Sequence, residues 1–168
     1  MAQMFFNEIE AVKIAQNLER NGLAFYRKAA DRAQDQATRD VFLRLAEDEK
    51  DHLAHFEELE ETLQQQRRTG AGYTDDAEIG AYIDRLLRTQ VFGDESDVAR
   101  LADQAESDYE TLAVGMRAER DSILFYQEML DFVDAKVAKE AFEHILQEER
   151  RHLSLLGDRS EHCEDAQG

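Results

Sequence analysis

Hydrophobic residues recur at helical spacing in four long segments, at about 7–32, 36–66, 107–133 and 135–156. In the second segment they follow the alternating three-and-four rhythm that marks one face of a helix: Phe42, Leu45, Phe56, Leu59 and Leu63. The first segment opens with NEIE and the third with SDYE, two capping-box patterns that indicate helix starts. Gly157 is the expected stop of the fourth. The pattern therefore predicts four amphipathic helices.

The lengths of the links between these segments predict how the helices are arranged. The links within each pair are short, whereas about 68–106 separates the second helix from the third and holds a shorter helical pattern, AEIGAYIDRLLRTQ, and a turn at FGDES. Two antiparallel hairpins joined by one long crossover are typical of ferritin-like four-helix bundles. We expect an all-α fold with one ferritin-like domain over 1–157, followed by a flexible polar tail, 158–168.

Polar residues interrupt the hydrophobic faces at positions that should point inward. Continuing the rhythm of the second segment leads to Glu49 and His52, three residues apart and hence on one side of the helix. The fourth segment carries the same Glu-x-x-His pattern at Glu149 and His152. Single inward glutamates, Glu19 and Glu119, lie on the faces of the first and third segments. A buried carboxylate is costly unless it is paired, hydrogen-bonded or bound to a metal.

The two halves of the chain repeat one another at an offset of 100 residues. Ten identities fall between positions 10–53 and 110–153, at residues 10, 19, 20, 25, 26, 31, 42, 49, 52 and 53 of the first copy. The inward glutamates and histidines are among them. A repeat that preserves polar interior residues predicts that both copies contribute to one symmetric site.

Four glutamates and two histidines in a bundle interior form the ligand pattern of di-iron and di-manganese carboxylate proteins. Four carboxylates balance the charge of two divalent cations, and carboxylate with imidazole suits iron, manganese or zinc. The alternative is a charge network or hydrogen-bonded polar layer without a metal, which would leave six buried polar groups to satisfy one another.

Composition limits the other classes of function. The formal charge of −18 argues against binding to nucleic acid or to an anionic membrane surface. A single cysteine excludes an intrachain disulfide and Cys-x-x-Cys metal sites, and we find neither a membrane span nor a signal-peptide pattern. We expect a cytoplasmic protein.

Four motifs carry a resemblance to a known family: LERNGLAFY, RLAEDEKDHLAHF, RAERDSILFY and ILQEERRHLSLL. Over roughly residues 5–156 the chain resembles the erythrin domain of rubrerythrins, within the ferritin-like superfamily. The resemblance implies that Glu19, Glu49 and His52 hold one iron and that Glu119, Glu149 and His152 hold the other, with Glu49 and Glu149 as bridges. It also implies that Tyr26 and Tyr126 bond to ligand carboxylates; the alternative is that both are ordinary core tyrosines.

Two features depart from the rubrerythrin pattern. Ser122 stands where rubrerythrins carry an extra glutamate, and the sequence has no rubredoxin-type cysteine pairs. Both departures put the family's usual route of peroxide reduction in doubt. His55 and His144 lie off the inward faces, and we expect them at the surface.

The expected function is that of a non-haem di-iron carboxylate protein with two iron ions per chain, for which manganese or zinc could substitute. It would react with dioxygen or hydrogen peroxide as a ferroxidase or peroxide-scavenging oxidoreductase in iron handling or oxidative stress, with no catalytic residues beyond the metal ligands. A homodimer and an external electron donor are expected. The alternatives are an iron-binding or storage protein with little turnover, and a helical interaction module whose polar core is structural.

Overall fold

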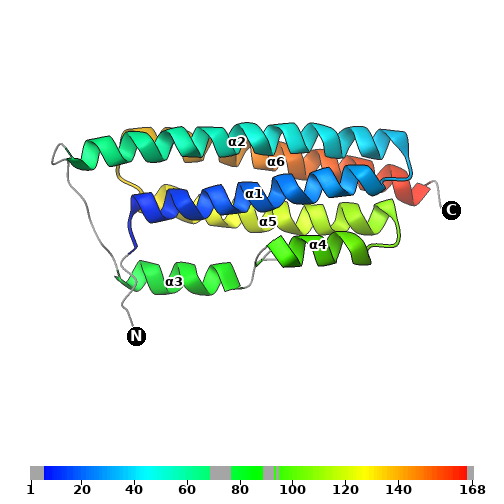
Figure 1. Ribbon diagram of the computed structural model, residues 1–168, viewed down its shortest axis with the longest axis horizontal. Coiled ribbons are helices and arrows are strands. Elements are labelled where there is room, and N and C mark those ends of the chain that lie inside the picture. Colours follow the sequence, from blue (N-terminus) through cyan, green and yellow to red (C-terminus); the bar gives the residue numbers. More distant parts are fainter. Residues whose placement is uncertain (1–5, 69–76, 89–92, 94, 166–168) are drawn as a thin grey trace.

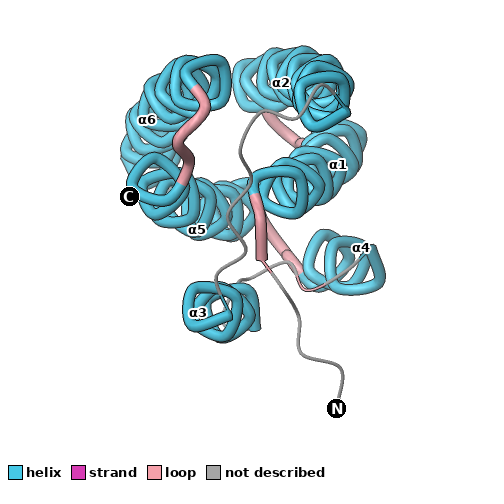
Figure 2. The backbone as a smooth tube through the Cα atoms, turned by 90° about the vertical axis from the view of Figure 1, so that its left-hand side faces the viewer, coloured by secondary structure: helices cyan, strands magenta, loops and turns pink. Residues whose placement is uncertain are grey.

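The computed structural model describes residues 6–68, 77–88, 93 and 95–165. The described residues form six helices: α1 (Glu8–Arg32), α2 (Gln36–Arg68), α3 (Ala77–Arg88), α4 (Glu95–Gln104), α5 (Asp108–Phe132) and α6 (Lys136–Asp165). The helices α1, α2, α5 and α6 run along the long axis of the molecule (Figure 1). Seen end-on, these four surround a common interior, and α3 and α4 lie outside it (Figure 2). The predicted all-α ferritin-like bundle of two hairpins is confirmed.

The long helices begin where the sequence provides a capping side chain. Asn7 precedes α1, and its Oδ1 accepts a hydrogen bond from the backbone N–H of Glu10 at 2.9 Å. Ser107 precedes α5, and its Oγ accepts from the N–H of Glu110 at 3.2 Å. Each cap satisfies one of the N–H groups that a helix start leaves without a partner, so both predicted helix starts are confirmed.

The two hairpin loops are held by carboxylates at the starts of the other hairpin's helices. Asp108, at the start of α5, accepts from the backbone N–H groups of 34–35 at 3.0 and 2.9 Å. Glu8, at the start of α1, accepts from the N–H groups of 134–135 at 2.6 and 2.8 Å. Glu8 and Asp108 are 100 residues apart, as are the two loops. The repeat in the sequence thus appears in the fold as an approximate twofold relation between the hairpins.

The interior contains two hydrophobic clusters, and the repeat distributes its aromatic residues between them. One cluster contains Phe25, Tyr26 and Phe42, and the other contains their counterparts 100 residues later, Phe125, Tyr126 and Phe142. All six side chains are at most 1% exposed. Aromatic side chains bury large areas, so the two clusters hold the four helices together.

The crossover contributes two helices on the outside of the bundle. The helix predicted in AEIGAYIDRLLRTQ is confirmed over Ala77–Arg88 as α3, whose Ile83 is buried in the cluster around Phe125; residues 89–90 lie outside the described residues. The sequence analysis did not predict α4, which buries Val98 against the cluster around Phe25. Lys28 of α1 pairs with Asp103 at the end of α4 at 2.9 Å. In the segment FGDES, residues 92 and 94 lie outside the described residues, and Glu95 already begins α4.

The prediction that Gly157 ends the last helix is wrong. The helix α6 continues through Gly157 to Asp165, so 158–165 is helical instead of a flexible tail. A glycine inside a helix costs only about 1 kcal/mol relative to alanine, and contacts of the last turns oppose that cost. Ser160 and Cys163 are buried. Arg159 donates from Nε to Thr38 Oγ1 at 2.9 Å, which fixes the end of α6 against the start of α2.

Among the described residues, none of the helices is both long enough and apolar enough to cross a membrane.

Candidate metal centre

The bundle interior brings together all six residues that the sequence predicts as metal ligands. Helices α1 and α5 each supply one glutamate, and α2 and α6 each supply a glutamate and a histidine one turn apart. None is more than 4% exposed: Glu19, Glu49, His52, Glu119, Glu149 and His152. Helical spacing explains the local arrangement, because residues three apart project from the same face.

These six residues form two overlapping groups of four. The first group is Glu19, Glu49, His52 and Glu149, and the second is Glu49, Glu119, Glu149 and His152. Within each group, one candidate ligand atom per residue lies within 4.8 Å of every other. Glu49 and Glu149 belong to both groups, the relation expected of carboxylates that bridge two ions.

The histidine rings direct one nitrogen toward this cluster. His52 Nδ1 lies 3.2 Å from Glu19 Oε2 and 3.0 Å from Glu149 Oε1. His152 Nδ1 lies 3.3 Å from Glu49 Oε1. The rings stack with centroids 5.4 Å apart and an interplanar angle of 19°. The two imidazoles therefore face the carboxylates from adjacent positions on α2 and α6.

The other ring nitrogens contact two carboxylates that the sequence analysis missed. His52 Nε2 lies 2.7 Å from Glu148 Oε2, and His152 Nε2 lies 3.2 Å from Asp48 Oδ2. Each contact crosses from α2 to α6. A carboxylate on Nε2 fixes the tautomer and orientation of an imidazole whose Nδ1 is a ligand. The sequence repeat could have indicated these two carboxylates, because an acidic residue directly precedes the glutamate of each Glu-x-x-His pattern.

The two tyrosines bond across the bundle to the single glutamates of the opposite hairpins. Tyr26 of α1 donates its hydroxyl to Glu119 Oε1 of α5, and Tyr126 of α5 donates to Glu19 Oε1 of α1. Burial and the neighbouring carboxylates raise the pKa of both hydroxyls well above the usual value. Each tyrosine therefore keeps its proton and orients one carboxylate of the cluster.

The cluster perturbs the pKa values of its own members. Burial, followed by repulsion from nearby carboxylates, raises the pKa of Glu49 and of Glu149 well above the usual value. Burial also opposes ionisation of Glu119, but contacts with the His152 imidazole, together with hydrogen bonds to neighbouring side chains, outweigh it and lower that pKa. Burial disfavours the charged form of His152, yet Glu119 and the other carboxylates raise its pKa to about 9. Without a cation, protons must compensate for the concentrated negative charge.

Unsatisfied polar atoms show that the residues suit a metal. Among the described residues, four buried atoms make no hydrogen bond, although all of them lie within ion-pair distance of one another or of His52: Glu49 Oε1, Glu119 Oε2, Glu149 Oε1 and His152 Nδ1. Buried polar atoms are nearly always bonded, and all four belong to the second candidate group. Carboxylate oxygens and an imidazole nitrogen are ligands for iron, manganese and zinc. The donor set therefore fits divalent cations of this kind.

A glycine provides space for one shared carboxylate. A Cβ atom on Gly22 of α1 would lie 2.5 Å from Glu49 Oε2. Real Cβ atoms essentially never approach a heavy atom this closely, so the missing side chain lets Glu49 extend toward α1. Position 122, the counterpart of Gly22 in the repeat, is a serine, so the repeat is not identical around the cluster.

The remaining histidines lie outside the cluster. His55 and His144 are exposed, as predicted, with ring centroids 6.0 Å apart. His162 is exposed on α6, and its Nδ1 lies 2.7 Å from the carbonyl oxygen of Asp158.

Comparisons with known proteins support both the fold and the family resemblance. A crystal structure of a DUF305 fragment from Deinococcus radiodurans aligns with a TM-score of 0.67 and 15% identity, covering 92% of this chain and 95% of that chain. At this identity the likeness shows the fold alone. No curated protein matches the chain significantly. The family model Rubrerythrin matches residues 3–75. The resemblance to rubrerythrins is therefore confirmed over the segment that carries Glu19, Glu49 and His52.

Proposed function

We propose that this protein binds two iron ions per chain in the bundle interior and reacts with dioxygen or hydrogen peroxide. The observation that supports it best is the pair of overlapping four-residue groups, which share Glu49 and Glu149. A structural polar layer would need its members to satisfy one another, yet four of their atoms have no hydrogen-bond partner among the described residues.

The two groups suggest a role for each ligand. Glu19 and His52 would hold one ion, and Glu119 and His152 the other. Glu49 and Glu149, which belong to both groups, would bridge them. Four carboxylates balance two divalent charges, so the buried site is neutral when loaded. Manganese or zinc would suit the same ligands.

When bound, an iron pair supplies electrons to the oxidant, and the chain provides the surroundings for this chemistry. None of the six residues is more than 4% exposed, and this burial strengthens electrostatic interactions within the site. Tyr26 and Tyr126 hold their protons on the hydroxyl oxygens and keep Glu119 and Glu19 in place. Asp48 and Glu148 orient the histidines, so that each Nδ1 faces the carboxylates. Repeated turnover would also need an external electron donor.

Anaerobic titration followed by oxidation tests the proposal. The metal-free protein is titrated with Fe(II), the bound iron is quantified, and air or hydrogen peroxide is added to separate samples while absorbance is followed. We expect about two irons per chain and oxidation faster than in a protein-free control. Glu49→Ala should abolish both effects. Glu47→Ala, which removes an exposed carboxylate from the same helix, should change neither.

The same experiment separates the alternatives. Stoichiometric binding of iron without accelerated oxidation would favour an iron-binding or storage protein with little turnover. If the protein binds no iron, and no manganese or zinc in parallel titrations, its polar core is structural and the metal proposal is refuted altogether. Size-exclusion chromatography tests the expected homodimer. Elution at the size of a dimer would also count against a storage role, which requires a much larger hollow assembly.

A further inference from the structure

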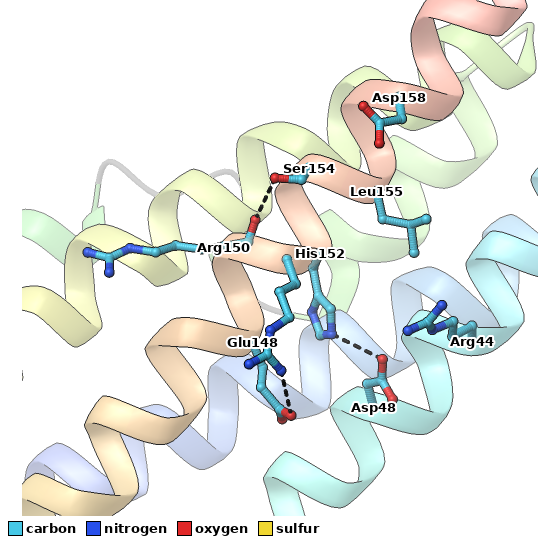
Figure 3. Close-up of a pocket in the computed structure, with 9 residues that line it drawn as sticks. Arg44, Asp48, Glu148, Arg150, His152, Ser154, Leu155 and Asp158 are labelled. Carbon is cyan, nitrogen blue, oxygen red and sulfur yellow. Dashed lines mark hydrogen bonds and ion pairs between the residues drawn. The ribbon is translucent and has the colours of Figure 1, made fainter.

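A cavity of about 520 Å³ opens between α2 and α6 on the outer side of His152. Asp48 and His152 both line this cavity. Figure 3 shows the 3.2 Å contact between the Asp48 carboxylate and the His152 ring. Arg44 of α2 and Leu155 of α6 line the cavity near this pair (Figure 3). Its volume lies within the range of roughly 300–1,000 Å³ common for small-molecule sites. The His152 ring thus lies between a ligand-sized cavity and the carboxylate cluster.

Three arginines and three carboxylates line this cavity: Arg44, Arg150, Arg151, Asp48, Glu148 and Asp158. The side chain of Arg150 points away from His152 (Figure 3). Arg44 has no ion-pair or hydrogen-bond partner among the described residues. Arg151 also lines the cavity; it pairs with Glu148 at 3.6 Å, and its side chain is 72% exposed. Of the three carboxylates, Asp48 and Glu148 are already bonded to histidines, and Asp158 is exposed on α6. The guanidinium group of Arg44 is therefore available to an added ligand, and that of Arg151 would exchange its 3.6 Å contact with Glu148 for one.

The opposite edge of the cluster lacks this pair of arginines. At the 100-residue offset, Arg44 corresponds to His144, Arg151 to Asp51 and Leu155 to His55. Two of these counterparts, His144 and His55, are the exposed histidines whose ring centroids lie 6.0 Å apart. Each edge has one histidine–carboxylate contact, His52–Glu148 or His152–Asp48. The residues on the outer side of these two contacts differ. Arg44 and Arg151 are therefore features of one edge of the cluster and are not repeated at the other.

We propose that this cavity binds a small molecule through its carboxylate or phosphate group, held by Arg44 and Arg151. A planar guanidinium group can donate two parallel hydrogen bonds to an oxyanion, which makes arginine well suited to this recognition. Leu155 would pack against the remainder of the ligand. The bound molecule would lie beside the Asp48–His152 pair, outside the metal centre. The site goes beyond the proposed function and requires no bound metal.

Binding to the metal-free full-length chain tests the proposal directly. Inorganic phosphate and citrate are titrated separately by calorimetry at constant ionic strength. We expect saturable binding of one anion per chain, and the tighter anion identifies the preferred acid group. Arg44→Gln and Arg151→Gln should each weaken that binding at least about tenfold, because hydrogen bonds to charged groups contribute about 1.5–3 kcal/mol.

A matched variant distinguishes a specific site from general attraction to positive charge. Arg117→Gln removes the same charge from an exposed position on α5 and should leave the affinity unchanged. In ¹⁵N NMR spectra, the anion should shift the Nε2 signal of His152, which lines the cavity, more than that of His52, which contacts the cavity only through Glu148. Three results would overturn the proposal: no saturable binding of either anion, unchanged affinity in both cavity variants, or an equal loss in Arg117→Gln. None of them would affect the metal proposal.

Discussion

Gly22→Ala should weaken metal binding while leaving the bundle folded. The new Cβ would lie 2.5 Å from Glu49 Oε2, whereas ordinary contacts begin near 3.4 Å. The carboxylate must therefore move by about 0.9 Å, the difference between these two distances. Glu49 is only 4% exposed, so it has little free space. Because it belongs to both candidate groups, the displacement should affect both ions.

The substitution Gly22→Ala should affect the stability of the metal-free protein and its affinity for metal in opposite directions. Replacing glycine by alanine inside a helix stabilises it by roughly 0.5–1 kcal/mol. Misplacing a shared ligand should lower metal affinity about 10–100-fold, similar to losing an outer partner of a metal ligand. The variant should thus be about as stable as the wild type without metal, or more stable, and should bind metal less tightly.

Cobalt(II) is a suitable probe because its absorption reports coordination without a redox reaction. Anaerobic titration gives affinity and stoichiometry, and thermal unfolding gives the stability of the metal-free protein. Gly157→Ala is the matched control: it also replaces a helical glycine, but its Cβ would meet nothing within 4 Å. It should show the gain in stability alone. If Gly22→Ala binds cobalt as tightly as Gly157→Ala does, the assignment of Glu49 as a metal ligand is wrong.

Three further predictions concern side chains in and around the bundle. Tyr126→Phe removes the donor to Glu19 and should lower cobalt affinity about tenfold in the same titration; unchanged affinity would mean that the tyrosine is only a core residue. The double change Glu49→Leu with Glu149→Leu should abolish metal binding and raise the free energy of unfolding of the metal-free protein by about 1–4 kcal/mol, measured in urea; a loss of stability would contradict the cost assigned to the buried carboxylates. Asp35 precedes α2, and hydrogen bonds from the first turn of that helix lower its pKa below the usual 3.8. Its stabilising effect should be complete well above that value and disappear as the pH falls through the lowered pKa. Wild type and Asp35→Asn should therefore differ in urea unfolding at pH 7, and the difference should shrink as the pH falls below about 3.8. A difference independent of pH would refute the role of this ionisation.

Local patterns in the sequence were sufficient for the main helices and for the six clustered residues. Helical periodicity identified α1, α2, α5 and α6, because an amphipathic helix repeats its buried positions at a fixed spacing. The same spacing directed Glu49 and His52 inward, and the repeat at 100 residues supplied Glu149 and His152. Residues on one face of one helix can be recognised without knowing which helix they will meet.

The misassigned parts depended on contacts between distant segments. Gly157 suggested a helix stop, but α6 continues because Arg159 bonds to Thr38 and Cys163 is buried. The short helix α4 is stabilised in part by packing Val98 against the bundle. In both cases the energy that decides the conformation comes from tertiary packing, which can override weak local preferences.

The sequence by itself determined a four-helix bundle with an inward-facing set of glutamates and histidines, because periodicity and repetition are local properties of a chain. Only the tertiary structure decided which groups meet across the bundle. It brings the hydroxyls of Tyr26 and Tyr126 to the single inward glutamates of the opposite hairpin, Glu119 and Glu19. It also brings Asp48 and Glu148 to the histidines of the facing helices. It also opens a cavity beside His152. These features depend on the rotation and separation of helices about 100 residues apart, which packing fixes and local spacing does not encode.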